Sequence, residues 1–246
     1  VFRFGLSGAP LSQYVFWLEN EVSRYDPDLV IINLVHNDFS QSLSAPDGTY
    51  SQSFAILKRN DKGFLLNDPS PYKRDLSWFI KRSAIFRYLW VKEQIRPDTI
   101  KSLVARIGSF FNNKVDKKIS MPINNVSQKS SDDDAIFKAT DYLFQRLKKY
   151  SEEHSSDLVL VMDGNRGAKT VEATRNKIND MVENISFNRD IFLLDLTPIF
   201  WKDYIENKKD HLFKVDGHWN SYAHGLVADS IFDFMKINKI ILASDE

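Results

Sequence analysis

The stretch Asp28-Leu-Val-Ile-Ile-Asn-Leu-Val35 decides the fold class of this chain. It is a nearly continuous apolar run, entered through Asp26-Pro27 and followed closely by the polar pair Asn37-Asp38. Such a run is typical of a strand that is buried on both faces of a parallel sheet. Similar runs predict three further strands, at Val1–Phe4, Asp157–Met162 and Asp190–Asp195.

Between these strands, apolar residues recur at the spacing of an amphipathic helix, as Leu11, Val15 and Leu18 do. Strands that alternate with helices predict an α/β fold, with a mainly parallel sheet covered by helices on both faces. The predicted helices span Leu11–Tyr25, Asp134–Ser151, Ala168–Ile185 and Ser221–Met235.

The region from Phe39 to Asp133 interrupts this alternation with polar, turn-rich sequence. We interpret it as a partly helical insertion, at about residues 39–133, with a helix near Asp75–Ile95 and a polar tail at Asn124–Asp133. The 246 residues suit one large α/β domain, so residues 1–246 are predicted to form a single domain that carries this insertion.

The composition excludes several classes of protein. The 33 basic and 33 acidic residues cancel, so the chain lacks the basic surplus that is typical of nucleic-acid-binding proteins. It has no cysteine, and therefore no disulfide, thiolate metal site or cysteine nucleophile. No apolar run reaches the roughly 18 residues that a membrane-spanning helix needs. We therefore expect a soluble protein, and the oligomeric state stays open.

Three polar segments occupy positions where catalytic groups are often found. Asp216-Gly-His218 precedes the last predicted helix, and an Asp beside a His can hold the imidazole of a general base in the required tautomer. Gly8, in the turn after the first predicted strand, can leave a backbone N–H facing a ligand. The side-chain amide of Asn37, near the end of the next strand, can donate to a developing oxyanion. Each segment taken alone is also compatible with an ordinary turn or helix cap.

Together, and in this order, the segments resemble the sequence blocks of the SGNH (GDSL-like) hydrolase superfamily. Gly8 resembles the glycine of the second block, Asn37 the asparagine of the third, and Asp216 and His218 the acid and base of the last. Further similar stretches are Tyr25–Ile32, Leu194–Pro198, and Trp219-Asn220 followed by His224. The resemblance implies a flavodoxin-like, three-layer α/β/α sandwich. It also implies catalytic roles for Asp216 and His218, and an oxyanion hole formed by Gly8 and Asn37.

The sequence departs from the family pattern in three places. Val35 stands where the third block usually has glycine, and one residue rather than two separates Asp216 from His218. The first block, Gly-Asp-Ser at the end of an opening strand, is missing. We expect that strand and the serine nucleophile to lie upstream of Val1. The alternative is that Ser7, in Gly5-Leu-Ser-Gly-Ala9, is the nucleophile of an α/β-hydrolase-like elbow.

His36 and Arg166 follow predicted strands and are candidates for substrate binding. His211 and His154 lie in polar surroundings and are expected at the surface. No metal site and no cofactor are predicted. The resemblance implies hydrolysis of small O-acyl esters, above all O-acetyl esters of carbohydrate, through an acyl-enzyme. The alternatives are an O-acetyltransferase of the same fold and an inactive domain that binds a glycan or a partner. The compartment stays open, with a lean toward the bacterial periplasm or another extracytoplasmic location.

Overall fold

The computed structural model describes residues 1–6, 8–44, 54–61, 63–69, 128–164, 176–215 and 217–241, with side chains in the first helix after residue 127 described from Asp133 onward. The chain divides into two compact units, one formed by residues 1–70 and 130–246 and the other by residues 71–129. The helix predicted near Asp75–Ile95 lies outside the described residues. The parallel sheet belongs to the first unit.

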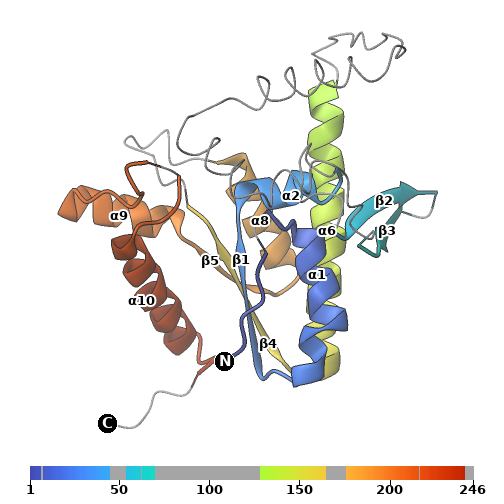
Figure 1. The fold of residues 1–246 in the computed structure, drawn as a ribbon, viewed down its shortest axis with the longest axis horizontal. Coiled ribbons are helices and arrows are strands. Elements are labelled where there is room, and N and C mark those ends of the chain that lie inside the picture. Colours follow the sequence, from blue (N-terminus) through green and yellow to red (C-terminus); the bar gives the residue numbers. More distant parts are fainter. Residues whose placement is uncertain are drawn as a thin grey trace, which may run out of the picture. The chain divides into compact units, whose positions relative to one another are not determined.

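Three parallel strands form the sheet of this unit (Figure 1). Strand β1 (Leu29–Leu34) pairs with β4 (Asp157–Met162), and β4 pairs with β5 (Phe192–Asp195), in the order β1-β4-β5. The register places Leu34 beside Met162, and Met162 beside Asp195. Three strands predicted from apolar runs are therefore confirmed, within two residues at each end, and the fold is a mixed α/β fold with a parallel sheet.

Alternate residues of β4 belong to two different hydrophobic clusters. Leu158, Leu160 and Met162 pack in a cluster with residues of α1 (Leu11–Asn20), α6 (Gln128–His154) and α8 (Lys177–Asn188). Val159 and Val161 pack in a second cluster with residues of α9 (Thr197–Asn207) and α10 (Ser221–Ile237). Because successive side chains of a strand point to opposite faces, both faces of the central strand are buried. This explains why the sequence of β4 is apolar throughout.

The strand predicted at Val1–Phe4 is wrong, because these residues have no regular secondary structure. The rings of Phe2 and Phe4 instead contact the ring of Tyr25, with centroids 4.2 and 5.8 Å apart. A strand needs a neighbour to satisfy its backbone groups, and among the described residues β1 pairs with β4 alone. Phe2 and Phe4 therefore pack against an aromatic ring rather than pairing as part of a sheet.

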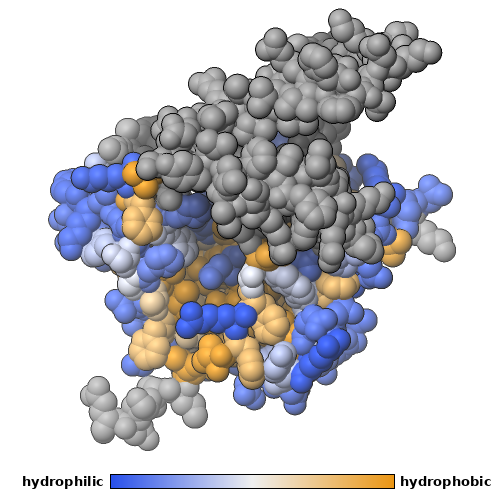
Figure 2. All heavy atoms as spheres, viewed as in Figure 1, coloured by the Kyte–Doolittle hydropathy of each residue, from blue (hydrophilic) through white to orange (hydrophobic). Residues whose placement is uncertain are grey.

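The open edge of β1 is accompanied by exposed apolar side chains. Ile31 in the middle of β1 is 40% exposed, and Phe2 and Phe4 are also exposed. Figure 2 shows apolar side chains gathered on the viewed face between α10 and α1, over β1 and the first residues of the chain.

The helices largely follow the predicted spans. The segment Leu11–Tyr25 is divided into α1 and a 3-10 turn, η1 (Val22–Tyr25). The predicted helix Ala168–Ile185 is wrong at its start, because Asn176 is extended and caps α8, which begins at Lys177; residues 165–175 lie outside the described ranges. Helix α6 begins at Gln128, inside the polar stretch that was predicted as a tail. The sequence did not predict α2 (His36–Gln41), α9, or the antiparallel hairpin of β2 (Ile56–Asn60) and β3 (Gly63–Asn67). In the part of the chain that the structure describes, no helix has the length and apolar character required to cross a bilayer.

Candidate functional site

The carboxyl ends of the three parallel strands meet at one edge of the sheet. Asp163 follows β4, and Asp195 ends β5. Gly164 allows the two strand ends to approach closely, because a Cβ atom at this position would lie 2.7 Å from the backbone nitrogen of Thr197. The segment that follows β1, beginning at Val35, lies at the same edge, since the backbone N–H of Asp163 donates to the carbonyl of Leu34 at 2.9 Å. An edge of this kind is where open α/β sheets bind ligands.

Asn179, on the first turn of α8, connects the ends of β4 and β5. Its amide nitrogen Nδ2 donates to Asp195 Oδ1 at 2.8 Å, to Thr197 Oγ1 at 3.0 Å and to the backbone carbonyl of Asp163 at 3.3 Å. The residue is buried, with 5% of its surface exposed. The hydrogen bonds compensate the burial of this polar group, which would otherwise be destabilising. No sequence signal pointed to Asn179.

His36 is the predicted substrate-binding residue that the structure ties most directly to this edge. Its Nε2 lies 2.8 Å from Asn179 Oδ1, and its side chain is half-buried. It begins α2, the short helix that follows β1. The prediction that His36 lies at the end of the strand is confirmed. Its role in binding a substrate stays a prediction.

Asn37, the predicted oxyanion donor, is exposed on α2. Its Nδ2 donates to Oε1 of Gln41, one turn later, at 2.9 Å. An amide nitrogen carries two hydrogens, so this bond leaves a second N–H for another acceptor. Asn37 therefore lies on the helix that follows β1 rather than on the strand itself, and its role as an oxyanion donor stays a prediction.

Gly8, the other predicted oxyanion donor, adopts φ +74°, a left-handed conformation that favours glycine. The turn is held in place by the start of α1, where the buried Ser12 N–H donates to Ser42 Oγ at 2.9 Å. The Ser12 hydroxyl donates to the carbonyl of Ala55 at 2.7 Å, and Gln13 Oε1 accepts from the Ala55 N–H at the same distance. These three bonds join the turn of Gly8 to α2 and to the segment before β2.

Asp38 is a buried carboxyl group in the middle of this region, 3% exposed. Its Oδ2 accepts from the backbone N–H of Val35 at 2.9 Å. Burial raises the pKa of Asp38 to about 7, because the hydrogen bonds from Val35 and Tyr14 offset only part of the desolvation and the Asp163 carboxyl raises it further. Burial, followed by the neighbouring Asp38 charge, also raises the pKa of Tyr14. The Asp38 carboxyl therefore holds its proton to a much higher pH than an exposed carboxyl does.

The segment His211–Asn220 forms a narrow loop before α10. Leu212 and Trp219 form an isolated antiparallel bridge, the Phe213 N–H donates to the His218 carbonyl at 3.0 Å, and the Asn220 N–H donates to the His211 carbonyl at 2.9 Å. Asn220 also caps α10, because its Oδ1 accepts from the Ala223 N–H at 2.9 Å. His218, the predicted general base, lies near the tip of this loop and is exposed.

The two histidines of this loop differ completely, and the expectation that His211 is exposed is wrong. His211 is 4% exposed, and its Nε2 lies 2.8 Å from Asp203 Oδ2 on α9. Asp203 Oδ1 accepts in addition from the Tyr222 hydroxyl at 2.6 Å and from Asn207 Nδ2 at 2.7 Å. The polar residues near His211 suggested the surface, but His211 belongs to a buried hydrogen-bond network that anchors the base of the loop to α9 and α10.

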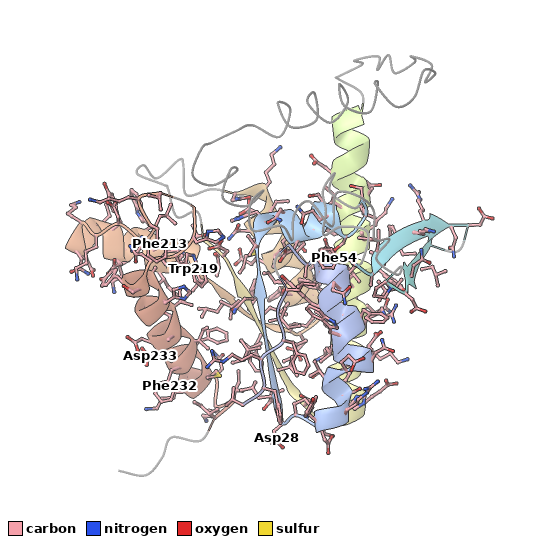
Figure 3. All side chains as sticks on the ribbon, viewed as in Figure 1. Asp28, Phe54, Phe213, Trp219, Phe232 and Asp233 are labelled. Atoms are coloured by element: carbon pink, nitrogen blue, oxygen red, sulfur yellow. The ribbon has the colours of Figure 1, made fainter. Side chains whose placement is uncertain are left out.

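A hydrogen bond joins this loop to the sheet edge. Trp219, adjacent to His218, donates from Nε1 to Asp163 Oδ1 at 3.2 Å, and Asp163 is 2% exposed. The Trp219 ring also contacts Phe200 on α9, with centroids 5.9 Å apart (Figure 3). No sequence signal pointed to the link between Asp163 and Trp219. The loop and the ends of β1 and β4 thus belong to one connected region.

Three candidates, Ser7, Asp216 and Arg166, lie outside the described residues. Asp195 uses its Oδ1 to accept from the Thr197 N–H at 2.9 Å and from Asn179, so this oxygen helps to start α9. Within the described ranges, no group of three His, Asp or Glu side chains is arranged to hold a metal ion.

An open groove elsewhere on the unit, lined by residues of α1 and α6, has Arg146 at its wall. The guanidinium is already paired with the Glu19 carboxylate, with Nε to Oε1 at 2.8 Å. We therefore place the candidate site at the sheet edge rather than in this groove. No protein-family model, curated protein or solved structure matches the chain.

Proposed function

We propose that the protein is a serine-type acyl hydrolase of the SGNH kind, acting on small O-acyl esters and above all on O-acetyl groups of carbohydrate. The observation that carries the proposal is the hydrogen bond between Trp219 and Asp163. It joins the loop of His218 to Asp163 after β4, and β4 pairs with β1, the strand that precedes the helix α2 with Asn37. This link supports the proposal, because acyl transfer requires a base and an oxyanion donor in the same region.

The proposed architecture is a three-layer α/β/α sandwich, with a further parallel strand beside β1. Two hydrophobic clusters, one containing Leu160 and the other containing Val161, support helical layers on both faces. The exposed Ile31 and the single described neighbour of β1 support an additional strand at this edge. Parallel sheets are normally buried on both faces, and an open apolar edge invites pairing. The serine nucleophile is proposed to end that strand.

In the proposed mechanism the serine hydroxyl oxygen attacks the ester carbonyl, and His218 takes the hydroxyl proton. Asp216 orients His218 and stabilises the imidazolium. The N–H of Gly8 and the second N–H of Asn37 donate to the oxyanion. Collapse breaks the ester C–O bond, and His218 returns the proton to the departing alcohol. Water then attacks the acyl-enzyme with His218 again as base, which releases the carboxylic acid and the free serine.

A fluorophosphonate probe and the hydrolysis of phenyl acetate by the complete protein test the proposal. We expect the probe to label one serine, and Asn37→Ala to lower kcat about 10²–10³-fold, as the loss of one oxyanion donor does. The matched control is Asn188→Ala, because Asn188 is also an asparagine whose amide donates one turn along its helix, to Asn184 at 2.6 Å. Equal activity of the two variants would contradict the role of Asn37. Labelling at Ser7 would identify Ser7, rather than a serine on the proposed additional strand, as the nucleophile. A protein that is neither labelled nor active would instead favour a domain that binds a glycan or a partner.

A further inference from the structure

The hydrogen bonds of Asn179 determine which nitrogen of His36 carries a proton. Asn179 Nδ2 lies within hydrogen-bond distance of the Asp195 carboxylate and of the Asp163 carbonyl, and both of these oxygens only accept. Reversing the amide would place its oxygen against two acceptors. The nitrogen therefore faces Asp163 and Asp195, and Oδ1 faces His36.

Because Asn179 Oδ1 can only accept, Nε2 of His36 must donate the 2.8 Å hydrogen bond between them. In a neutral imidazole one nitrogen donates and the other accepts. His36 is thus held as the Nε2–H tautomer, and Nδ1 is the acceptor. Within the described part of the chain, the bond to Asn179 is the one hydrogen bond that His36 makes.

The position of this acceptor suits a substrate hydroxyl. His36 precedes the proposed oxyanion donor Asn37, and its half-buried ring is anchored through a residue that is itself 5% exposed. A fixed, partly buried acceptor binds an O–H or N–H donor, whereas an ester or aryl group has no hydrogen-bond donor for it. Sites built to hydrogen-bond a substrate hydroxyl discriminate against analogues that lack it.

We propose that Nδ1 of His36 accepts a hydrogen bond from a hydroxyl group on the alcohol portion of the ester, and so selects polyhydroxylated, carbohydrate-type esters over simple ones. Asn179 is the positioning residue that fixes the tautomer. The selection among ester substrates rests on the proposed function. The tautomer of His36 rests on the hydrogen bonds of Asn179 alone.

The kinetic test compares acetylated xylobiose with phenyl acetate as substrates of the complete protein. His36→Gln keeps a donor that can reach Asn179 but removes the Nδ1 acceptor. We expect it to lower the ratio of kcat/KM for acetylated xylobiose to kcat/KM for phenyl acetate about tenfold, the value of one hydrogen bond. An equal loss on both substrates would mean a structural role, and no loss on either would mean no role; both outcomes overturn the inference.

A second measurement does not depend on turnover. The ¹⁵N resonances of the His36 ring above neutral pH should show a protonated Nε2 and an unprotonated Nδ1, and unacetylated xylobiose should shift the Nδ1 resonance. A protonated Nδ1, or no shift with xylobiose, overturns the inference even if the protein hydrolyses esters. Loss of esterase activity with the xylobiose shift intact instead overturns the proposed function and leaves the hydroxyl contact standing.

Discussion

The carboxyl groups of Asp203, beneath the loop 211–220, and Asp38, after β1, are buried to nearly the same extent, at 7% and 3% exposed. Burial alone would raise the pKa of Asp203, but hydrogen bonds from Tyr222, His211 and Asn207 outweigh it, and its pKa is lowered. Asp38 receives hydrogen bonds from Val35 and Tyr14 and lies near a second carboxyl group, so its pKa is raised to about 7.

The difference shows that desolvation and hydrogen-bond partners together decide the charge of a buried acid. Asp203 is a structural anion that holds the base of the loop. Asp38 is a group close to its titration point, at the end of the strand that leads to Asn37. Three substitutions test this contrast, and they differ in the size of their expected effects.

Replacing Asp203 should have the largest effect. Asp203→Ala leaves the buried His211 and its neighbours without their acceptor, and we expect the free energy of unfolding at pH 7 to fall by about 4 kcal/mol. The folded pKa of Asp203 is below its unfolded value, so its stabilising contribution is present above about pH 4 and is lost as the pH falls through the folded pKa. Urea denaturation should therefore show a smaller deficit at pH 3 than at pH 7.

The control for this experiment is Asp233→Ala, on the exposed surface of α10 (Figure 3). It should change stability by no more than about 0.5 kcal/mol. If Asp203→Ala were as mild as this control, His211 would not be an anchor, and the contrast between the two carboxyl groups would disappear.

Replacing Asp38 should act in the opposite direction. Its folded pKa of about 7 exceeds the unfolded value of about 3.9, so the folded state binds the proton more tightly and stability falls as the pH rises from about 4 to about 7. Three pKa units correspond to a ceiling of roughly 4 kcal/mol. Asp38→Asn cannot ionise, although its amide needs a new acceptor near Tyr14. We expect the variant to gain about 2 kcal/mol relative to the natural protein between pH 4 and pH 8.

Denaturation of both proteins at pH 4 and pH 8 provides this comparison. The Asn oxygen can still accept from the Val35 N–H, which keeps the end of β1 intact. A stability difference that does not change with pH would mean that Asp38 is already ionised at pH 4, as Asp203 is expected to be.

The smallest effect is expected for Tyr14→Phe. The Tyr14 hydroxyl donates to Asp38 and lowers its pKa, so its loss should raise the pKa of Asp38 further and cost about 1 kcal/mol of stability at pH 8. At pH 4 the carboxyl is protonated and the cost should be smaller. Tyr25→Phe is the control, because Tyr25 contacts Phe2 and Phe4 through its ring. Equal effects of the two substitutions at pH 8 would remove Tyr14 as a determinant of the Asp38 charge.

The sequence predicted the central part of the fold well because burial on both faces leaves a continuous apolar run. Strand β4 was predicted at Asp157–Met162, as observed. The incorrect strand prediction at Val1–Phe4 has the same origin, because an apolar run does not show whether a neighbouring strand is present to pair with it. Helix α9 was missed because it begins with Thr197-Pro198, and proline in a first turn resembles a loop when read alone.

The site was less predictable than the fold. Gly8, Asn37 and His36 were proposed as site residues because they follow predicted strands, and their roles stay predictions. Asn179 lies on a helix among ordinary polar residues, and only the three-dimensional structure brings it beside His36. The partners of Asp203 are four to nineteen residues away along the chain, and no local pattern connects them.

The hydrogen bond from Trp219 to Asp163 also makes the loop optically observable. Indole fluorescence depends on the polarity and hydrogen bonding of its surroundings, and Trp219 is directly adjacent to the proposed general base. The chain has five tryptophans, so replacing the other four with phenylalanine would leave a single emitter on this loop. Its emission would then show, in real time and without a label, whether the loop stays on the sheet edge when an ester arrives.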